Sequence, residues 1–107
     1  MIRNDFVSNS SSSSYIIGFA TEDAFNEFKN KILNEWGRDN KFGKLLIESF
    51  NRNICDKNDY DEKEFKRFDV LLRGVYQSTD GTFERLGPER LIYEEAYTDD
   101  ERIEVFD

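Results

Sequence analysis

Histidine is absent from the 107-residue chain, and cysteine occurs only once, as Cys55. Without histidine, neither Ser-His-Asp nor Cys-His catalysis can be assembled, and imidazole metal sites are excluded. A single cysteine can build neither a structural zinc site nor an internal disulfide. We therefore interpret Cys55 as a small buried hydrophobic residue or a bystander thiol in a reducing cytosol.

Long apolar runs are also missing. No stretch of about 18 apolar residues occurs, so the sequence predicts no membrane span. The first residues lack the basic-then-apolar order of a secretory signal, which favours a cytoplasmic protein. The glycines are too scattered to form a phosphate-binding loop of either common type. These absences disfavour an enzyme, and we predict no catalytic residues, no cofactor and no metal.

The length is that of one compact domain, and we assign residues 1–107 to a single domain. Within it, residues 1–14 form a serine-rich N-terminal segment and residues 89–107 an acidic C-terminal segment. Hydrophobic residues make up only 37% of the chain, but ten Phe, five Tyr and one Trp can each bury a large area. A folded core is therefore expected.

The net charge of −8 is unevenly distributed. Acidic and basic residues balance in residues 1–55, so the whole excess of acid lies in residues 56–107. This field disfavours direct binding of DNA or RNA, because affinity for nucleic acid comes largely from cations that displace counterions. A partner with a basic or nucleic-acid-binding surface fits the sign better. The alternative is an acidic surface that only keeps the protein in solution.

The first part of the chain predicts a strand and then a helix. Residues 14–20 are rich in β-branched and aromatic side chains, as in a strand. Thr21 can cap a helix over residues 22–36, and Gly37 is placed to end it. Apolar residues recur in this helix at spacings of three and four and form one stripe for core packing: Phe25, Phe28, Ile32, Leu33 and Trp36.

Residues 41–54 fit two structures. Their apolar residues suit a helical face, and these are Phe42, Leu45, Leu46, Phe50 and Ile54. Residues 45–47 could equally be a short buried strand, because periodicity does not decide so short a run. We favour the helix.

Strands dominate the predictions for the rest of the chain. Residues 64–77 should begin as a helical turn and become a strand with Val70, Leu72 and Tyr76 on one side. A tight turn at Ser78–Gly81 would then lead into a return strand.

That return strand covers residues 82–86, and residues 90–97 and 102–107 are expected to be the third and fourth strands of an antiparallel meander. The order of elements indicates an α+β fold, a single small domain with a mainly antiparallel sheet and one or two helices packed on it.

Carboxylates are plentiful in two segments. Asp56–Glu64 is suggestive of a calcium loop, but Asp61 and Arg67 stand where an EF-hand needs Gly and Glu, so a solvated loop is expected. Adjacent acids such as Glu94 and Glu95 could in principle serve glycoside hydrolysis, but a domain this small offers little room for a deep cleft.

Three aromatic residues lie among the acids of the C-terminal segment, and interface anchors are often aromatic. We predict a partner-binding surface formed by Tyr93, Glu94, Glu95, Tyr97, Asp99, Asp100, Glu101 and Phe106. Asp56–Glu64 would add to its electrostatic steering. The alternative for the aromatic residues is ordinary packing within strands.

Five consecutive serines form the low-complexity stretch of the chain: Ser10, Ser11, Ser12, Ser13 and Ser14. This composition is typical of a flexible linker. Apolar residues on both sides, Phe6-Val7 and Tyr15–Ile17, favour a tethered surface loop that runs into the first strand. Its hydroxyl and N–H groups could bind an anion, cap a helix or accept a modifying group.

The stretch RNDFVSNSSSSSYII, residues 3–17, resembles a recurrent opening of small uncharacterised proteins encoded by tailed bacteriophages and other mobile elements. That opening reads approximately R-x-x-F-V-S-N-S-S-S-S-S-F, and here Tyr15 replaces the usual Phe. The resemblance covers only this stretch and implies no particular activity. It implies a phage or mobile-element setting and a protein made in the cytoplasm of an infected bacterium.

Together these features predict a phage-encoded accessory protein, not an enzyme, that binds and modulates or inhibits a host protein. A defence or nucleic-acid-processing enzyme would suit the acidic surface. A second hypothesis is a structural or oligomerisation protein, a virion or assembly component that uses the serine-rich segment. A third is a small enzyme or a substrate for modification at Ser8–Ser14. The sequence leaves the oligomeric state open.

Overall fold

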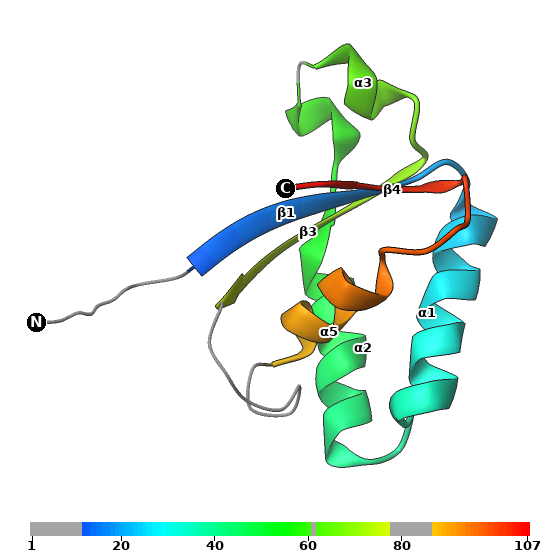
Figure 1. Cartoon of the computed structure of the whole chain (residues 1–107), viewed down its shortest axis with the longest axis vertical. Helices are drawn as coiled ribbons and strands as arrows, with labels where there is room; N and C mark the ends of the chain where they lie inside the picture. The colour runs from blue at the N-terminus through cyan, green and yellow to red at the C-terminus, as the bar shows by residue number, and fades with distance from the viewer. Residues whose placement is uncertain (1–11, 61, 78–86) are drawn as a thin grey trace, which may run out of the picture.

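The computed structural model describes residues 12–60, 62–77 and 87–107 and shows an α+β fold (Figure 1). In these residues four strands form one antiparallel sheet in the order β2-β3-β1-β4. The strands are β1 (Ser12–Phe19), β2 (Ile54–Cys55), β3 (Val70–Gln77) and β4 (Ile103–Phe106). The helical elements are α1 (Glu22–Trp36), α2 (Lys41–Asn53), the 3-10 turn η1 (Lys57–Asp59), α3 (Lys63–Lys66) and α5 (Pro88–Glu95). The predicted fold class is confirmed.

β1 lies in the middle of the sheet. Its whole length pairs with β3, from Ser12 opposite Gln77 to Phe19 opposite Val70. Its second half also pairs with β4, with Ile16 opposite Phe106. The predicted meander is therefore wrong in its order, because the last strand, β4, pairs with β1 and not with a strand formed by residues 90–97.

The helices α1, α2 and α5 cover one face of this sheet (Figure 1). Side chains alternate along β1, so Tyr15, Ile17 and Phe19 all point into the core on that face. The buried helical residues that pack with them are Phe25, Phe28, Ile32, Leu33, Leu46, Phe50, Leu91 and Ile92. The stripe predicted for residues 22–36 is confirmed as core.

Both long helices begin and end at recognisable signals. The Thr21 hydroxyl accepts a hydrogen bond from the Ala24 N–H at 3.1 Å, and Gly37 closes α1 with φ 116°. Asn40 caps α2 by accepting from the Gly43 N–H at 2.6 Å. These caps satisfy backbone groups that a helix end leaves unpaired. The helix favoured for residues 41–54 is confirmed, although Leu45 and Ile54 of its predicted apolar face are exposed.

A smaller core covers part of the opposite face of the sheet. Phe65 and Phe68 of the α3 segment pack there on Leu71 and Phe106. The Phe68 ring lies directly over Gly18 of β1, where an added Cβ would come within 2.7 Å of it. The predicted helical turn followed by a strand is confirmed here by α3 and β3. So is the shared face of Val70, Leu72 and Tyr76.

The strand predicted over residues 90–97 is wrong, because most of this segment is helix α5. The helix starts at Pro88, whose fixed φ suits the first helical position, after Gly87 with φ 93°. Consecutive Leu91 and Ile92 are both buried in the same core, which a helix allows, whereas a strand would point them to opposite faces of the sheet. Local β preference of the Leu-Ile-Tyr run is overridden by this packing.

Smaller differences concern the edges of the other predictions. β1 begins at Ser12, two residues before the predicted start, and a short β2 follows α2 directly. Part of the predicted loop at Asp56–Glu64 forms η1 and the start of α3. The predicted turn at Ser78–Gly81 and return strand at residues 82–86 lie outside the described residues.

Glu89 connects three elements of the fold. Its carbonyl accepts a hydrogen bond from the buried Tyr15 hydroxyl of β1 at 2.8 Å. Its carboxylate accepts hydrogen bonds from Ser49 at 2.6 Å and from Arg52 at 2.9 Å, both on α2. Burial, with Glu89 nearby, raises the pKa of Tyr15, so its hydroxyl stays a donor. α5 is thus held in place against the sheet and α2.

Candidate protein-binding surface

Tyr93 and Tyr97 form a cluster with Asp107 beside the end of β4. Both hydroxyls donate hydrogen bonds to Asp107 Oδ2, at 2.5 Å from Tyr93 and 2.7 Å from Tyr97. These bonds lower the pKa of Asp107 and raise the pKa of Tyr93. The Tyr93 ring stacks on Tyr76 at 4.5 Å, whereas the Tyr97 residue is 57% exposed. Two predicted aromatic anchors therefore lie together, and Tyr97 presents its ring to solvent.

Arginine pairs engage several of the predicted acids. Glu94 forms an ion pair with Arg90 one turn earlier on α5, at 2.8 Å. Asp100 receives hydrogen bonds from Arg102, which also binds both carboxylate oxygens of Glu27 on α1. The hydrogen bonds from Arg102 lower the pKa of Asp100 to about 2. These acids fasten the C-terminal segment to itself and to α1.

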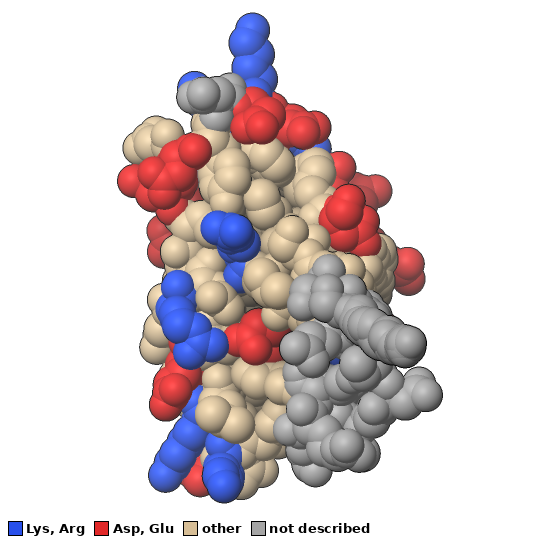
Figure 2. All heavy atoms as spheres, turned by 90° about the vertical axis from the view of Figure 1, so that its left-hand side faces the viewer, with Lys and Arg blue, Asp and Glu red and all other residues tan. Residues whose placement is uncertain are grey.

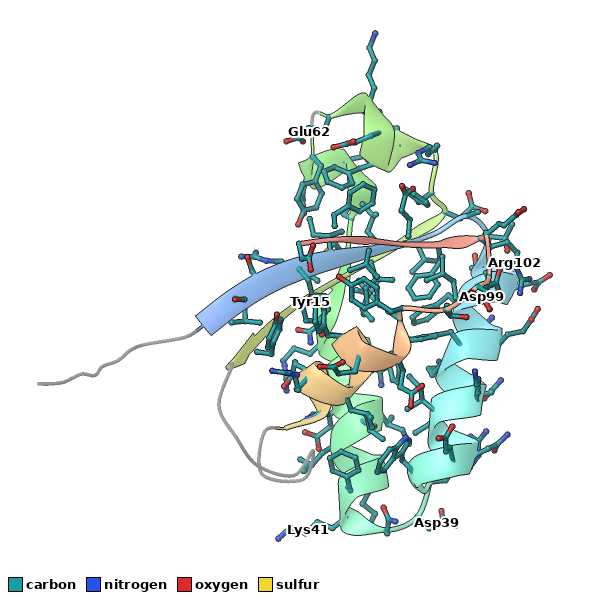
Figure 3. The ribbon with its side chains drawn as sticks, viewed as in Figure 1. Tyr15, Asp39, Lys41, Glu62, Asp99 and Arg102 are labelled. Carbon is teal, nitrogen blue, oxygen red and sulfur yellow. The ribbon has the colours of Figure 1, made fainter. Side chains whose placement is uncertain are left out.

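Three other predicted acids have no ion-pair partner within the described residues: Glu95, Asp99 and Glu101. Asp99 and Glu101 are exposed in the connection between α5 and β4, and Glu95 is half-buried at the end of α5. Figure 3 shows Asp99 and Arg102 at the same corner of the molecule. The negative charges of Glu95, Asp99 and Glu101 are therefore available to a partner.

A groove of about 500 Å³ runs between β4 and the segment that follows α5. Its lining includes Lys31, Glu95, Tyr97, Asp99, Ile103 and Val105. A hollow of about 200 Å³ toward α1 shares Lys31, Glu95, Thr98 and Ile103 with it. The structure thus brings predicted Glu95, Tyr97 and Asp99 together around one concave surface with an apolar floor.

Phe106 lies apart from these residues. Because neighbouring residues of a strand point to opposite faces, Phe106 projects away from the helices while Val105 faces them. Its ring packs edge-on against Phe65 at 5.0 Å and Phe68 at 5.8 Å. The structure does not bring Phe106 together with the tyrosines.

Only part of the serine run lies within the residues that the structure describes. Ser10 and Ser11 lie outside it, whereas Ser12, Ser13 and Ser14 belong to β1 and pair with β3. Ser13 and Ser14 are exposed. The last serines are therefore strand residues and not a loop, and their use for an anion or a modification stays a prediction.

A larger hollow, about 700 Å³, lies elsewhere, along β3 next to β2. Its charged lining is mixed: Arg52 and Arg73 with Asp56, Asp59 and Glu89. Figure 2 views the side where β1 begins and likewise shows acidic and basic side chains interspersed among uncharged ones. Nothing there selects one class of partner, in contrast to the groove beside β4.

Sequence reasoning missed Lys31, Ile103, Val105 and Asp107 as parts of the surface. No local pattern links Lys31 on α1 to residues 95–99, because only the folded chain brings them together. Apart from its charge, nothing in the sequence indicated that Asp107 belongs to this surface, since its contact with Tyr93 depends on where β4 ends.

Comparison with protein-family models, curated proteins and solved structures gave no match. Within the described residues, no His, Cys, Asp and Glu side chains gather in a group of three that could hold a metal ion. No helix in the same part of the chain is long and apolar enough to cross a bilayer.

Proposed function

We propose that this chain is a phage-encoded accessory protein that binds a host protein with a basic surface and so modulates it. The observation that carries the proposal is that two acids without ion-pair partners in the described residues, Glu95 and Asp99, line the groove that Tyr97 borders. Glu101, which also has no ion-pair partner there, is exposed in the segment that leads into β4. The resemblance of residues 3–17 to phage proteins supports the setting.

Charge complementarity would speed the encounter and select the partner. Among the residues that the structure describes, the groove is lined by three acids, Glu95, Asp99 and Glu104, and by one cation, Lys31. Acidic walls of this kind attract cationic surfaces and repel other acidic ones. A protein that normally holds nucleic acid carries such a cationic surface, and occupation by this chain would block it.

Tyr97 supplies an anchor of the kind that dominates interface energies. Tyrosine offers a large, stiff contact area with a polar tip. Its orientation is already fixed in the free protein by Asp107, so little conformational entropy is lost on binding. Binding in place of catalysis fits a chain without histidine.

Affinity capture from phage-infected cells tests the proposal. In the test variant Glu95, Asp99 and Glu101 are all changed to Lys, and we expect loss of the captured host protein. In the matched control Glu35, Asp39 and Glu48 are changed to Lys, which alters net charge equally at other exposed acids. Figure 3 shows Asp39 at the far end of the helices from Asp99. Equal capture by both variants would refute the proposal.

A further inference from the structure

Within the described residues, β4 is an edge strand of the sheet. The Ala20 N–H donates to the Arg102 carbonyl at 2.7 Å, which fixes the phase of the β1–β4 ladder. Backbone direction alternates along a strand, so Glu104 and Phe106 bond toward β1 while Ile103 and Val105 face outward. The Ile103 N–H is bonded to Asp100. In the described part of the chain, the Ile103 carbonyl and both polar groups of Val105 therefore face outward, where another strand could pair with them.

The groove lies on this open side of β4. Its lining contains Ile103, Glu104 and Val105 but no residue of β1, so it flanks the outer edge of the sheet. Ile103 and Val105 provide an apolar floor, since both pack partly against the main core. Glu95 and Asp99 line the same groove.

We propose that an extended, basic segment of the partner adds to the sheet as a strand along β4. This mode of binding rests on the function proposed above and specifies it. Main-chain hydrogen bonds to Ile103 and Val105 would provide affinity, and alternate side chains would provide specificity. Lys or Arg at every second position would enter the groove toward Glu95 and Asp99. The positions between them would lie on the other face of the sheet, near Phe106.

The charge around this edge selects against a second copy of the chain. Open edges invite pairing between identical molecules, and proteins commonly protect them with charge. Glu95 and Asp99 line the groove beside β4, whereas Glu104 on β4 itself pairs with Arg67. Two such edges side by side would set like charges against each other, which is destabilising. A basic strand meets the same groups with attraction.

Binding of a fluorescein-labelled peptide of alternating Lys and Val, about eight residues long, tests this inference by fluorescence polarisation. The Val105→Pro variant removes the outward N–H, at an edge position that tolerates proline. Val105→Ala is its control, because it shortens the side chain but keeps the N–H. We expect Val105→Pro to bind at least about tenfold more weakly than Val105→Ala.

Two N-methylated forms of the peptide test the native protein without any variant. One form is methylated on the odd residues and the other on the even residues. Since only every second amide of an added strand points to β4, one form should lose binding and the other retain it. Equal binding of both forms and of the parent peptide would overturn strand addition, whether or not Val105→Pro folds.

These binding experiments distinguish the failure of strand addition from the failure of the proposed acidic binding surface. If the Lys variant of Glu95, Asp99 and Glu101 loses the peptide while N-methylation has no effect, only strand addition fails. If that variant binds the peptide as the native protein does, the proposal that these acids bind the partner is refuted as well. Absence of any binding to the Lys-Val peptide, or equal binding of a Glu-Val peptide, overturns the inference. Self-association in sedimentation without peptide binding would assign the edge to a second copy and overturn it too.

Discussion

Gly74 of β3 is the position where the structure makes its sharpest prediction about stability. It lies opposite Tyr15 of β1, and the Tyr15 ring covers it. A Cβ added at Gly74 would stand 2.2 Å from the Tyr15 hydroxyl oxygen and 2.3 Å from Cζ. Ordinary contacts between such atoms need well over 3 Å, so Gly74→Ala must displace the ring.

The ring has little room to move. Tyr15 is 2% exposed, packs against Tyr93 at 5.2 Å and donates to the Glu89 carbonyl. Overpacking costs about 1–3 kcal/mol, and loss of the hydrogen bond costs about 1 kcal/mol. The reduced freedom of the unfolded chain returns about 0.5–1 kcal/mol. We expect Gly74→Ala to lower the free energy of unfolding by about 2 kcal/mol.

Urea unfolding of a double-mutant cycle measures this cost. In a Tyr15→Leu background the clash disappears, so Gly74→Ala should cost little and the coupling should be about 2 kcal/mol. In a Tyr15→Phe background the cost should persist, because Cζ remains. Val75→Ala, at an exposed neighbour, should change stability by less than about 0.5 kcal/mol. A Gly74→Ala variant as stable as Val75→Ala would refute the reasoning.

Two further predictions concern ion pairs. Arg102 lowers the pKa of Asp100 from 3.8 to about 2, so its stabilisation is present above pH 3.8 and is lost as pH falls toward 2. Unfolding midpoints measured across that range should fall more steeply for the native protein than for Arg102→Gln, and parallel curves would contradict this. Ser49→Ala should cost about 1–2 kcal/mol in urea unfolding, because it removes a buried hydrogen bond to Glu89. Arg52→Ala, which removes a mostly exposed partner of the same carboxylate, should cost less, and the reverse order would be evidence against this account.

Local signals explain what could be predicted of the fold. Thr21, the apolar stripe and Gly37 each act within a few residues, and together they define α1. β4 likewise follows from its own composition. Helix α5 could not be predicted from the sequence, because eight residues with a Leu-Ile-Tyr run carry little helical signal of their own. Its helix is stabilised by burial of Leu91 and Ile92 and by contacts of Glu89, all of which involve distant elements.

The error over residues 90–97 did not affect the expectation that Tyr93 and Tyr97 lie together. Residues four apart, such as Tyr93 and Tyr97, share a face in a strand and lie one turn apart in a helix. Their association was therefore independent of the element predicted. The prediction that Phe106 lies beside the tyrosines was wrong, since a strand places Val105 and Phe106 on opposite faces. The groove itself required Lys31 from α1, which no local pattern connects to Glu95.

Net charge alone does not identify a binding surface, because acids also serve the fold. Glu94, Asp100 and Glu104 belong to ion pairs with Arg90, Arg102 and Arg67. A partner that competed for these acids would have to break contacts already made. Glu95, Asp99 and Glu101 carry no such cost within the described chain, so charge at these three positions should affect binding more than stability. The expected result is a Lys variant that unfolds as the native protein does and yet captures no partner.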